Sequence, residues 1–268
     1  MATSKGIEFS PDTDIPSLKG KVILITGANS GLGKQASLEL AKHSPAMIYM
    51  AARSPEKGKE AIAEVQSQVP NANVSFLEMD LSSFASIKKA AKSVLDSSPR
   101  LDILMLNAGP TVMGCPPNAT AEGYEIQMGT NHVGHALLLK LLNPLLRQTT
   151  ATTAGTPARV VSMASSAWKH AGPEKIQFET LRDPFGAGAV TPVRRYIQSK
   201  TANMLYARAL ANRNMMVRPV SEGVKNQLWA ATAPAGDVVS GAHYEPVGYR
   251  PEPSGVMLDE ELGEKVWE

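Results

Sequence analysis

A glycine-rich segment at residues 26–33, TGANSGLG, follows an apolar run at 22–25 and precedes an apolar helical pattern. Glycines between a buried strand and a helix allow a tight turn, and they let backbone N–H groups at the start of the helix approach a pyrophosphate. Taken alone, this spacing also fits an ordinary strand-to-helix turn. Far downstream, Tyr196 and Lys200 stand four residues apart in YIQSK, which puts a phenol and an ammonium on one face of a helix. Together the two features favour a nucleotide-dependent redox enzyme.

The rest of the chain alternates short β-rich runs with helical patterns, which is typical of a parallel sheet built from β-α-β units. We predict strands at 21–26, 46–51, 73–79, 101–107 and 158–163, and helices at 32–42, 55–68, 84–95 and 121–142. The expected fold is therefore one doubly wound, Rossmann-like α/β domain over residues 20–268, a mostly parallel sheet with helices on both faces. Residues 1–19 are polar and lack the apolar core of a signal peptide, so they are interpreted as a polar N-terminal leader.

The balance of charges excludes a general electrostatic attraction to nucleic acid or to an acidic membrane, because 27 basic and 25 acidic residues give a net charge of +2. The most apolar helical pattern is interrupted by Lys140, Asn143 and Pro144, and it is too short to span a bilayer. The single cysteine, Cys115, cannot form an internal disulfide, which fits a reducing compartment. We expect a cytoplasmic protein whose partner is a small-molecule substrate, with no nucleic acid and no membrane span.

The end of the second predicted strand bears on the choice of cofactor. It reads Ala51-Ala52-Arg53 and lies about 20 residues after Gly33, where a bound ribose is expected. A carboxylate there would favour a free 2′-hydroxyl, whereas Ala52 removes that charge and the Arg53 guanidinium suits a 2′-phosphate. NADP(H) is therefore predicted over NAD(H). Lys57 could compete for the phosphate, and Arg53 could instead simply be a solvated residue at the start of the next helix.

At this point the chain resembles the short-chain dehydrogenase/reductase family, from about residue 18 to the end. The resemblance rests on short motifs in the family's order: TGANSGLG at 26–33, Asp80-Leu81 after the third strand, Asn107-Ala108-Gly109 after the fourth, Asn131 in the following helix, Ser165 after the fifth strand, and Tyr196 with Lys200. The segments AARSPEKG, TNHVGH and YIQSK are most similar to those of the retinol-dehydrogenase-like and fungal secondary-metabolism branches of the family.

The resemblance implies an oxidoreductase that interconverts an alcohol and a ketone or aldehyde. Tyr196 is its general acid or base, because Lys200 and an oxidised nicotinamide both favour the phenolate. Ser165 donates to the substrate oxygen, and Asn131, at a local irregularity in its helix, anchors a proton relay to Lys200. The implied cofactor-binding residues are Gly27, Ser30, Gly31, Leu32, Gly33, Arg53, Lys57, Asp80, Leu81, Asn107, Ala108, Gly109, Tyr196 and Lys200.

Structural alternatives exist for several of these residues. Asp80 meets the adenine in one interpretation and caps the next helix in the other. Residues 107–109 could stabilise the sheet as much as they touch the cofactor. His132 and His135 are three residues apart, but without a third ligand nearby a metal site is not expected.

The 30 residues at 166–195 form a longer connection than the smallest family members carry. Because this connection contains Trp168, Phe178 and Phe185, it is interpreted as an apolar lip over the substrate site. The alternative is a surface excursion whose aromatic side chains pack locally. The lip favours apolar substrates.

The main departure from the family follows residue 217, where the resemblance implies an internal deletion that shortens the substrate region near residues 214–221. A strand over 217–220 carries Pro219, which suits a central strand poorly, so the sheet is expected to have a gap there. The tail predicts a helix at 221–233, a last strand at 240–249 and a helix at 258–267. The protein is then either an active reductase, or a truncated or alternatively spliced form that binds nucleotide without efficient catalysis. The resemblance also implies a homodimer formed through the helices that carry Asn131 and Tyr196.

Overall fold

The computed structural model describes residues 6–110, 118–153, 157–172, 174–183, 191–212, 217–220 and 223–267. Its centre is a parallel sheet of six strands in the order β3-β2-β1-β4-β5-β6. The strands are β1 (Val22–Thr26), β2 (Met47–Ala52), β3 (Val74–Glu78), β4 (Ile103–Leu106), β5 (Arg159–Met163) and β6 (Val217–Val220). The order reverses between β1 and β4, and in open α/β sheets ligands bind outside the carboxyl ends of the strands at such a point.

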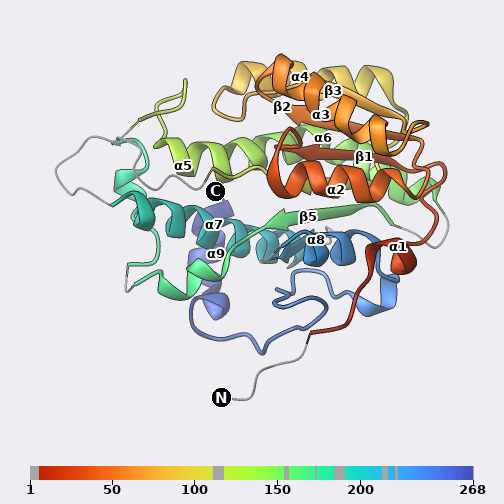
Figure 1. Cartoon of the computed structure of the whole chain (residues 1–268). Coiled ribbons are helices and arrows are strands. Elements are labelled where there is room, and N and C mark those ends of the chain that lie inside the picture. The colour runs from red at the N-terminus through yellow and green to blue at the C-terminus, as the bar shows by residue number, and fades with distance from the viewer. Residues whose placement is uncertain are drawn as a thin grey trace.

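Helices cover both faces of this sheet (Figure 1). They are α1 (Pro11–Asp14), α2 (Gly31–Ala41), α3 (Pro55–Gln68), α4 (Phe84–Ser97), α5 (Ile126–Met128), α6 (Gly134–Thr152), α7 (Pro192–Asn212), α8 (Gly223–Thr232) and α9 (Glu260–Trp267). Alternate residues of β1 enter different cores: Ile23 and Ile25 pack in a cluster with residues of α2 and α8, whereas Val22 and Leu24 pack in one with residues of α4 and α6. The expected doubly wound, Rossmann-like domain is confirmed.

The five predicted strands are found within one or two residues of their expected bounds. The helix expected at 121–142 differs, because the chain forms the short α5 and a π-helical segment at Gly129–Val133 before α6 continues to Thr152. A π segment inserts one extra residue per turn and is frequently found at functional sites. The irregularity expected around Asn131 is therefore present.

The region after α7 corrects two expectations. No gap separates β5 from β6, because Val217–Val220 pairs in parallel with β5, with Pro219 opposite Ser162. The strand lies at the edge of the described sheet, where proline is tolerated because one side needs no ladder hydrogen bonds. The last strand expected at 240–249 does not form, since these residues adopt turns and irregular structure with a single bridge residue at Tyr244. Tyr244 is buried against Trp229 of α8, and its carbonyl accepts a hydrogen bond from the Asn226 side chain. The Val247 carbonyl accepts one from the N–H of Ile7.

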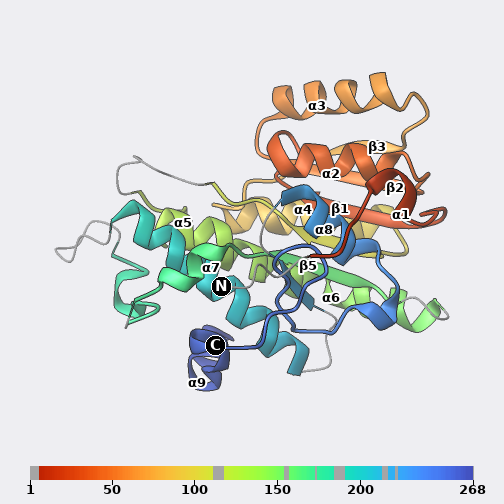
Figure 2. The ribbon, with the colours of Figure 1, turned by 60° about the horizontal axis from the view of Figure 1, so that its bottom comes forward.

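The N-terminal residues 6–19 pack against the domain, with Phe9, Ile15 and Leu18 buried in the same core as Ile23. Helix α9 packs against α7 (Figure 2). Trp267 of α9 stacks on Tyr206 of α7 with ring centroids 5.3 Å apart. No helix among the described residues is long and apolar enough to cross a membrane.

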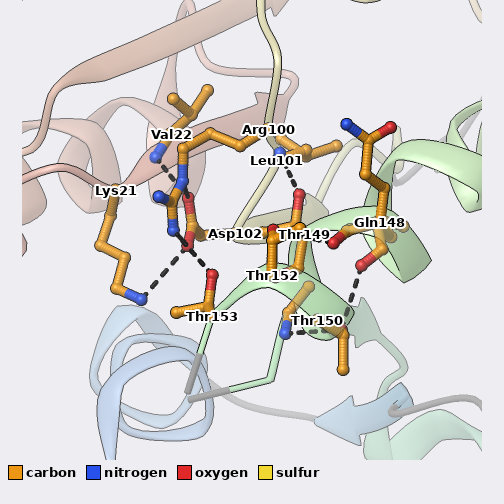
Figure 3. A network of polar contacts seen from close by, with 12 residues as sticks. Lys21, Val22, Arg100, Leu101, Asp102, Gln148, Thr149, Thr150, Thr152 and Thr153 are labelled. Carbon is orange, nitrogen blue, oxygen red and sulfur yellow. Dashed lines mark hydrogen bonds and ion pairs between the residues drawn. The ribbon is translucent and has the colours of Figure 1, made fainter. Parts of the chain in front are cut away.

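The opposite end of β1 and β4 from the reversal point is held by a buried charge. The carboxylate of Asp102 accepts two hydrogen bonds from Arg100, at 2.8 and 2.6 Å, and one from the N–H of Val22, and it pairs with Lys21 at 3.2 Å (Figure 3). These contacts fix the register of the two central strands and leave their carboxyl ends open for chemistry.

Candidate active site

The glycine-rich turn between β1 and α2 has the form needed to hold phosphate. Gly27 and Gly31 have φ angles of +65° and +53°, which glycine adopts without strain. The side chain of Ser30 does not cap α2, and Ser30, Gly31 and Leu32 are exposed, so the first N–H groups of this helix have no intrahelical acceptor and belong to solvent-exposed residues. A Cβ built on Gly31 meets nothing within 4 Å. This open helix start suits an anion of pyrophosphate size.

The turn is supported by the residues that follow β4. The N–H groups of Asn107 and Ala108 each donate to the hydroxyl of Thr26 at 2.9 Å, and the Asn107 amide donates to the Thr26 carbonyl at 2.8 Å. A Cβ on Gly33 would lie 2.5 Å from the Asn107 amide nitrogen. Asn107 and Ala108 therefore join β1 to β4 and close the back of the glycine turn, as the structural alternative expected.

Two cations lie on the side of the sheet where the cofactor ribose was predicted. Arg53, directly after β2, and Lys57, in the first turn of α3, are both exposed. Neither side chain has a hydrogen bond or ion pair with another described residue. The two positive charges are thus available to an anionic ligand.

The alternative prediction that Asp80 caps the next helix, α4, is wrong. Ser83 caps α4 by accepting from the N–H of Ser86, whereas the Asp80 carboxylate accepts from the N–H and hydroxyl of Ser82, at 2.9 and 2.7 Å. Asp80 thereby shapes the turn after β3, and Leu81 is buried in the core beneath it. Contact of either residue with adenine stays a prediction.

Tyr196 and Lys200 both lie on α7, with the Lys200 Nζ 5.7 Å from the centroid of the Tyr196 ring. Tyr196 is half-buried, whereas only 3 % of Lys200 is exposed. Burial lowers the pKa of the Lys200 amine to about 8. The amine donates to the carbonyl of Met163 at 2.9 Å, which ties α7 to the end of β5.

Asn131 lies in the π segment and is fully buried. Its amide nitrogen donates to the Ser199 hydroxyl at 3.0 Å, one residue before Lys200. Its amide oxygen accepts no hydrogen bond from the described residues. A Cβ built on Gly109 would lie 2.8 Å from the Lys200 Nζ and 3.7 Å from this oxygen, so the two polar atoms border the same position after β4.

Ser165 follows β5 by two residues and begins a 3₁₀ turn at Ser166–His170, where its hydroxyl accepts from the N–H of Ala167. The Lys200 bond to Met163 ties α7 to the end of β5, two residues before Ser165. Ser162, by contrast, is buried within β5. Ser165, which the family resemblance singled out, therefore follows the end of the strand, and its role stays a prediction.

At Trp168, the connection at 166–195 does not form the apolar lip that was expected. This side chain is buried in a core cluster with Met128, Ala202 and Met204, and it meets the His243 ring edge-on at 6.0 Å. Phe178 is partly exposed, and Phe185 lies outside the described residues, as does Cys115. Trp168 therefore fits the alternative of local packing.

Sequence reasoning missed the supporting roles of two histidines. His132 Nδ1 contacts the Asn203 amide oxygen at 3.1 Å, and His135 joins Thr26 to the carbonyl of Asn131. The signal for them is the segment NHVGH, whose two histidines were considered above only as metal ligands. Within the described ranges, no group of three His, Cys, Asp or Glu side chains could hold a metal ion.

Comparison with known proteins places this geometry in context. A sequence profile described as short chain dehydrogenase matches residues 21–178. A short-chain dehydrogenase/reductase of Armillaria gallica is 33 % identical over 288 aligned positions, which cover 95 % of this chain and 90 % of that protein. Human retinol dehydrogenase 11 is 38 % identical over 203 positions, covering 75 % of this chain but only 58 % of the relative.

Among solved structures, an uncharacterized protein from Mycobacterium paratuberculosis superposes with a TM-score of 0.73 at 27 % identity, covering 96 % of this chain and 94 % of that one. The similarity extends beyond the profile match to nearly the whole chain. The shortening predicted near residues 214–221 stays a prediction, although β6 and α8 are joined by only two residues.

Proposed function

Because the chain belongs to the short-chain dehydrogenase/reductase family, and is therefore an oxidoreductase, we propose that it uses NADP(H) to interconvert an alcohol and a ketone or aldehyde. The observation that carries the proposal is the position of Lys200. Its buried amine lies on the same helix as Tyr196, is bonded to the end of β5, and borders the residues that follow β4. A buried amine at the carboxyl ends of β4 and β5 has a clear use in proton transfer, whereas burial of its charge costs stability.

The residues divide the reaction between them. Tyr196 protonates the carbonyl oxygen during reduction, or removes the hydroxyl proton during oxidation. Lys200, cationic below its pKa of about 8, favours the phenolate and offers donors to the nicotinamide ribose. The Ser165 hydroxyl donates to the substrate oxygen as negative charge develops there, and Asn131 supports the proton path to Lys200. The nicotinamide, when bound, supplies or accepts the hydride.

The described residues fit such a dinucleotide. The free N–H groups at Ser30, Gly31 and Leu32 suit its pyrophosphate, and the open space beside Gly31 admits it. Arg53, with Lys57 as a second cation, suits a 2′-phosphate and supports NADP(H) over NAD(H). Gly109, whose added Cβ would contact Lys200, lets the backbone pass close to the catalytic amine.

The proposed substrate is small and apolar, and the proposed setting is secondary metabolism in the cytoplasm. This setting is supported by the resemblance of the segments AARSPEKG, TNHVGH and YIQSK to the fungal branch of the family. A homodimer through α6 and α7 belongs to the same proposal, with α9 already packed on part of α7 through Trp267 and Tyr206.

A second candidate is a protein that binds nucleotide without efficient catalysis. The two-residue connection between β6 and α8 supports it, because the family resemblance implies a longer substrate region here. Retention of Ser165, Tyr196 and Lys200 favours the enzyme, since a binding protein has no need of all three.

The test is turnover of NADPH with a panel of aldehydes and ketones, comparing the wild type with Tyr196→Phe. We expect the variant to lose about 10²–10⁴-fold in kcat with little change in NADPH affinity, because only the proton donor is removed. Equal loss of NADPH affinity and turnover would contradict the assigned role. Tight NADPH binding by a wild type that reduces no member of the panel would favour the second candidate.

A further inference from the structure

We infer that His135 is a positioning residue, which joins Thr26, the residue before the glycine-rich turn, to Asn131 and thereby orients the Asn131 amide oxygen beside Lys200. The inference rests on the proposed function and deepens it. His135 lies in the first turn of α6, directly after the π segment, and only 3 % of it is exposed. Its two ring nitrogens contact residues that are themselves part of the site.

The direction of each hydrogen bond follows from the atoms involved. The carbonyl of Asn131 can only accept, so the His135 Nδ1, 2.9 Å away, must carry the proton. A neutral imidazole has one N–H, so Nε2 accepts, and the Thr26 hydroxyl at 2.8 Å must donate to it. The Thr26 oxygen then accepts from the N–H groups of Asn107 and Ala108 with its two lone pairs. The Met105 carbonyl lies 3.4 Å from the same hydroxyl, so the shorter contact with Nε2 is the better acceptor for its single proton.

The ring is held neutral by its surroundings. Burial lowers the pKa of His135 to about 3, the nearby Lys200 and His132 act in the same direction, and the hydrogen bond to the Asn131 carbonyl opposes them. The donor and acceptor ends of the ring therefore keep their identities throughout the pH range in which the enzyme would work.

The other end of Asn131 is fixed by Ser199. The Ser199 hydroxyl donates its proton to the carbonyl of Tyr196 at 2.8 Å, so it must accept from the amide nitrogen of Asn131. The amide oxygen consequently points away from Ser199, toward the position at Gly109 that the Lys200 amine also borders. Asn131 is thus held at its carbonyl by His135 and at its amide by Ser199, and it supplies an oriented acceptor beside Lys200.

Two substitutions test the roles of Nδ1 and Nε2 of His135 separately. In His135→Asn, the shorter amide retains a donor near the place of Nδ1, whereas His135→Gln puts its amide near the place of Nε2 and loses the bond to Asn131. Thr149→Ala is the matched control, because Thr149 is buried in the same helix and bridges Leu101 N–H and Leu145 carbonyl far from the site.

We expect His135→Gln to lower kcat by about 10- to 100-fold and to shift the pH profile of kcat, with NADPH affinity within about threefold of the wild type. His135→Asn should recover most of the activity, and Thr149→Ala should lower the melting temperature without moving the pH profile. If His135→Gln behaves like Thr149→Ala, His135 serves only in packing and the inference is overturned.

A second readout needs no turnover. In ¹⁵N-histidine ring spectra of the wild type, assigned by the signal lost in His135→Asn, we expect a proton on Nδ1 and no titration between pH 5 and 8. A proton on Nε2, or titration near the ordinary value of about 6.5, would overturn the inference. A proton on Nδ1 in a wild type that reduces no carbonyl compound would support the arrangement of His135 and overturn the proposed function instead.

Discussion

The Lys200 ammonium donates a hydrogen bond of 2.9 Å to the carbonyl oxygen of Met163, the last residue of β5. The Asn203 amide donates to the same oxygen at 3.2 Å. One carbonyl thus anchors two successive turns of α7 to the end of the strand that leads to Ser165. The amine is positioned by the sheet as well as by its own helix, which gives it a defined direction without a carboxylate partner among the described residues.

Lys200→Met should lower kcat by about 10²–10⁴-fold, because the cation that favours the phenolate is removed. The stability of the wild type should rise with pH in the range where the buried amine loses its proton. Because burial lowers the folded-state pKa of Lys200 to about 8, the folded protein carries the cost of a buried ammonium below that pH. The cost is relieved between pH 8 and about 10.5, where the unfolded chain still holds the proton.

Denaturant unfolding at pH 7.5 and 10 measures this effect. The unfolding free energy at pH 10 minus that at pH 7.5 should be more positive for the wild type than for Lys200→Met. Lys140→Met, at an exposed position on α6, is the control and should match the wild type in both kcat and pH dependence. An identical pH response of wild type and Lys200→Met would show that the amine is solvated.

Arg53→Ala should weaken NADPH binding by about 1.5–3 kcal/mol and leave NADH binding unchanged, because a charge-assisted hydrogen bond to the 2′-phosphate is lost. Lys57→Ala should weaken NADPH binding less. Thermal shift with each nucleotide provides the measurement, with Lys59→Ala on the exposed side of α3 as the control. Greater stabilisation of the wild type by NADH than by NADPH would contradict the assignment of the cofactor.

Gly33→Ala should destabilise the protein by about 1–3 kcal/mol and weaken nucleotide binding, because the new Cβ would lie 2.5 Å from both the Asn107 amide nitrogen and the Gly27 carbonyl. The control is Gly263→Ala in α9, where an added Cβ meets nothing within 4 Å and alanine should stabilise the helix by about 0.5–1 kcal/mol. Urea unfolding and NADPH titration of both variants test the prediction. A neutral effect at Gly33 would mean that the turn does not pack against Asn107.

Asp102→Asn should destabilise the protein by about 2–4 kcal/mol, because it removes the negative charge that pairs with Arg100 and Lys21 (Figure 3). Burial raises the pKa of Asp102, but the hydrogen bonds from Arg100, Val22 and Lys21 together lower it below its ordinary value of 3.8. The stabilisation is therefore present above about pH 4 and lost as pH falls through the folded-state pKa.

Acid unfolding of Asp102→Asn should consequently show a weaker pH dependence than that of the wild type. Asp96→Asn removes the exposed pair with Lys92 and should change stability by less than about 0.5 kcal/mol. Similar losses in the two variants would mean that the buried network adds nothing beyond a surface pair.

Local patterns were enough to predict the five strands from β1 to β5, the glycine-rich turn after β1 and the position of Tyr196 and Lys200 on one helix. Strand periodicity, glycine at a tight turn and side chains four residues apart on a helix are properties of neighbouring residues, so they can be recognised in the sequence. The edge position of β6 and the irregular packing of Tyr244 on Trp229 could not be recognised in this way, because they depend on which surfaces remain uncovered after the sheet has formed.

The sequence by itself determined the kind of fold and the chemical groups available to it. Only the tertiary structure decided how those groups are oriented. His135 reaches Thr26 across 109 positions, and Lys200 reaches the Met163 carbonyl across 37. Such bonds form because strands and helices pack with one particular register, and a buried donor or acceptor that lacks its partner there is too costly to keep.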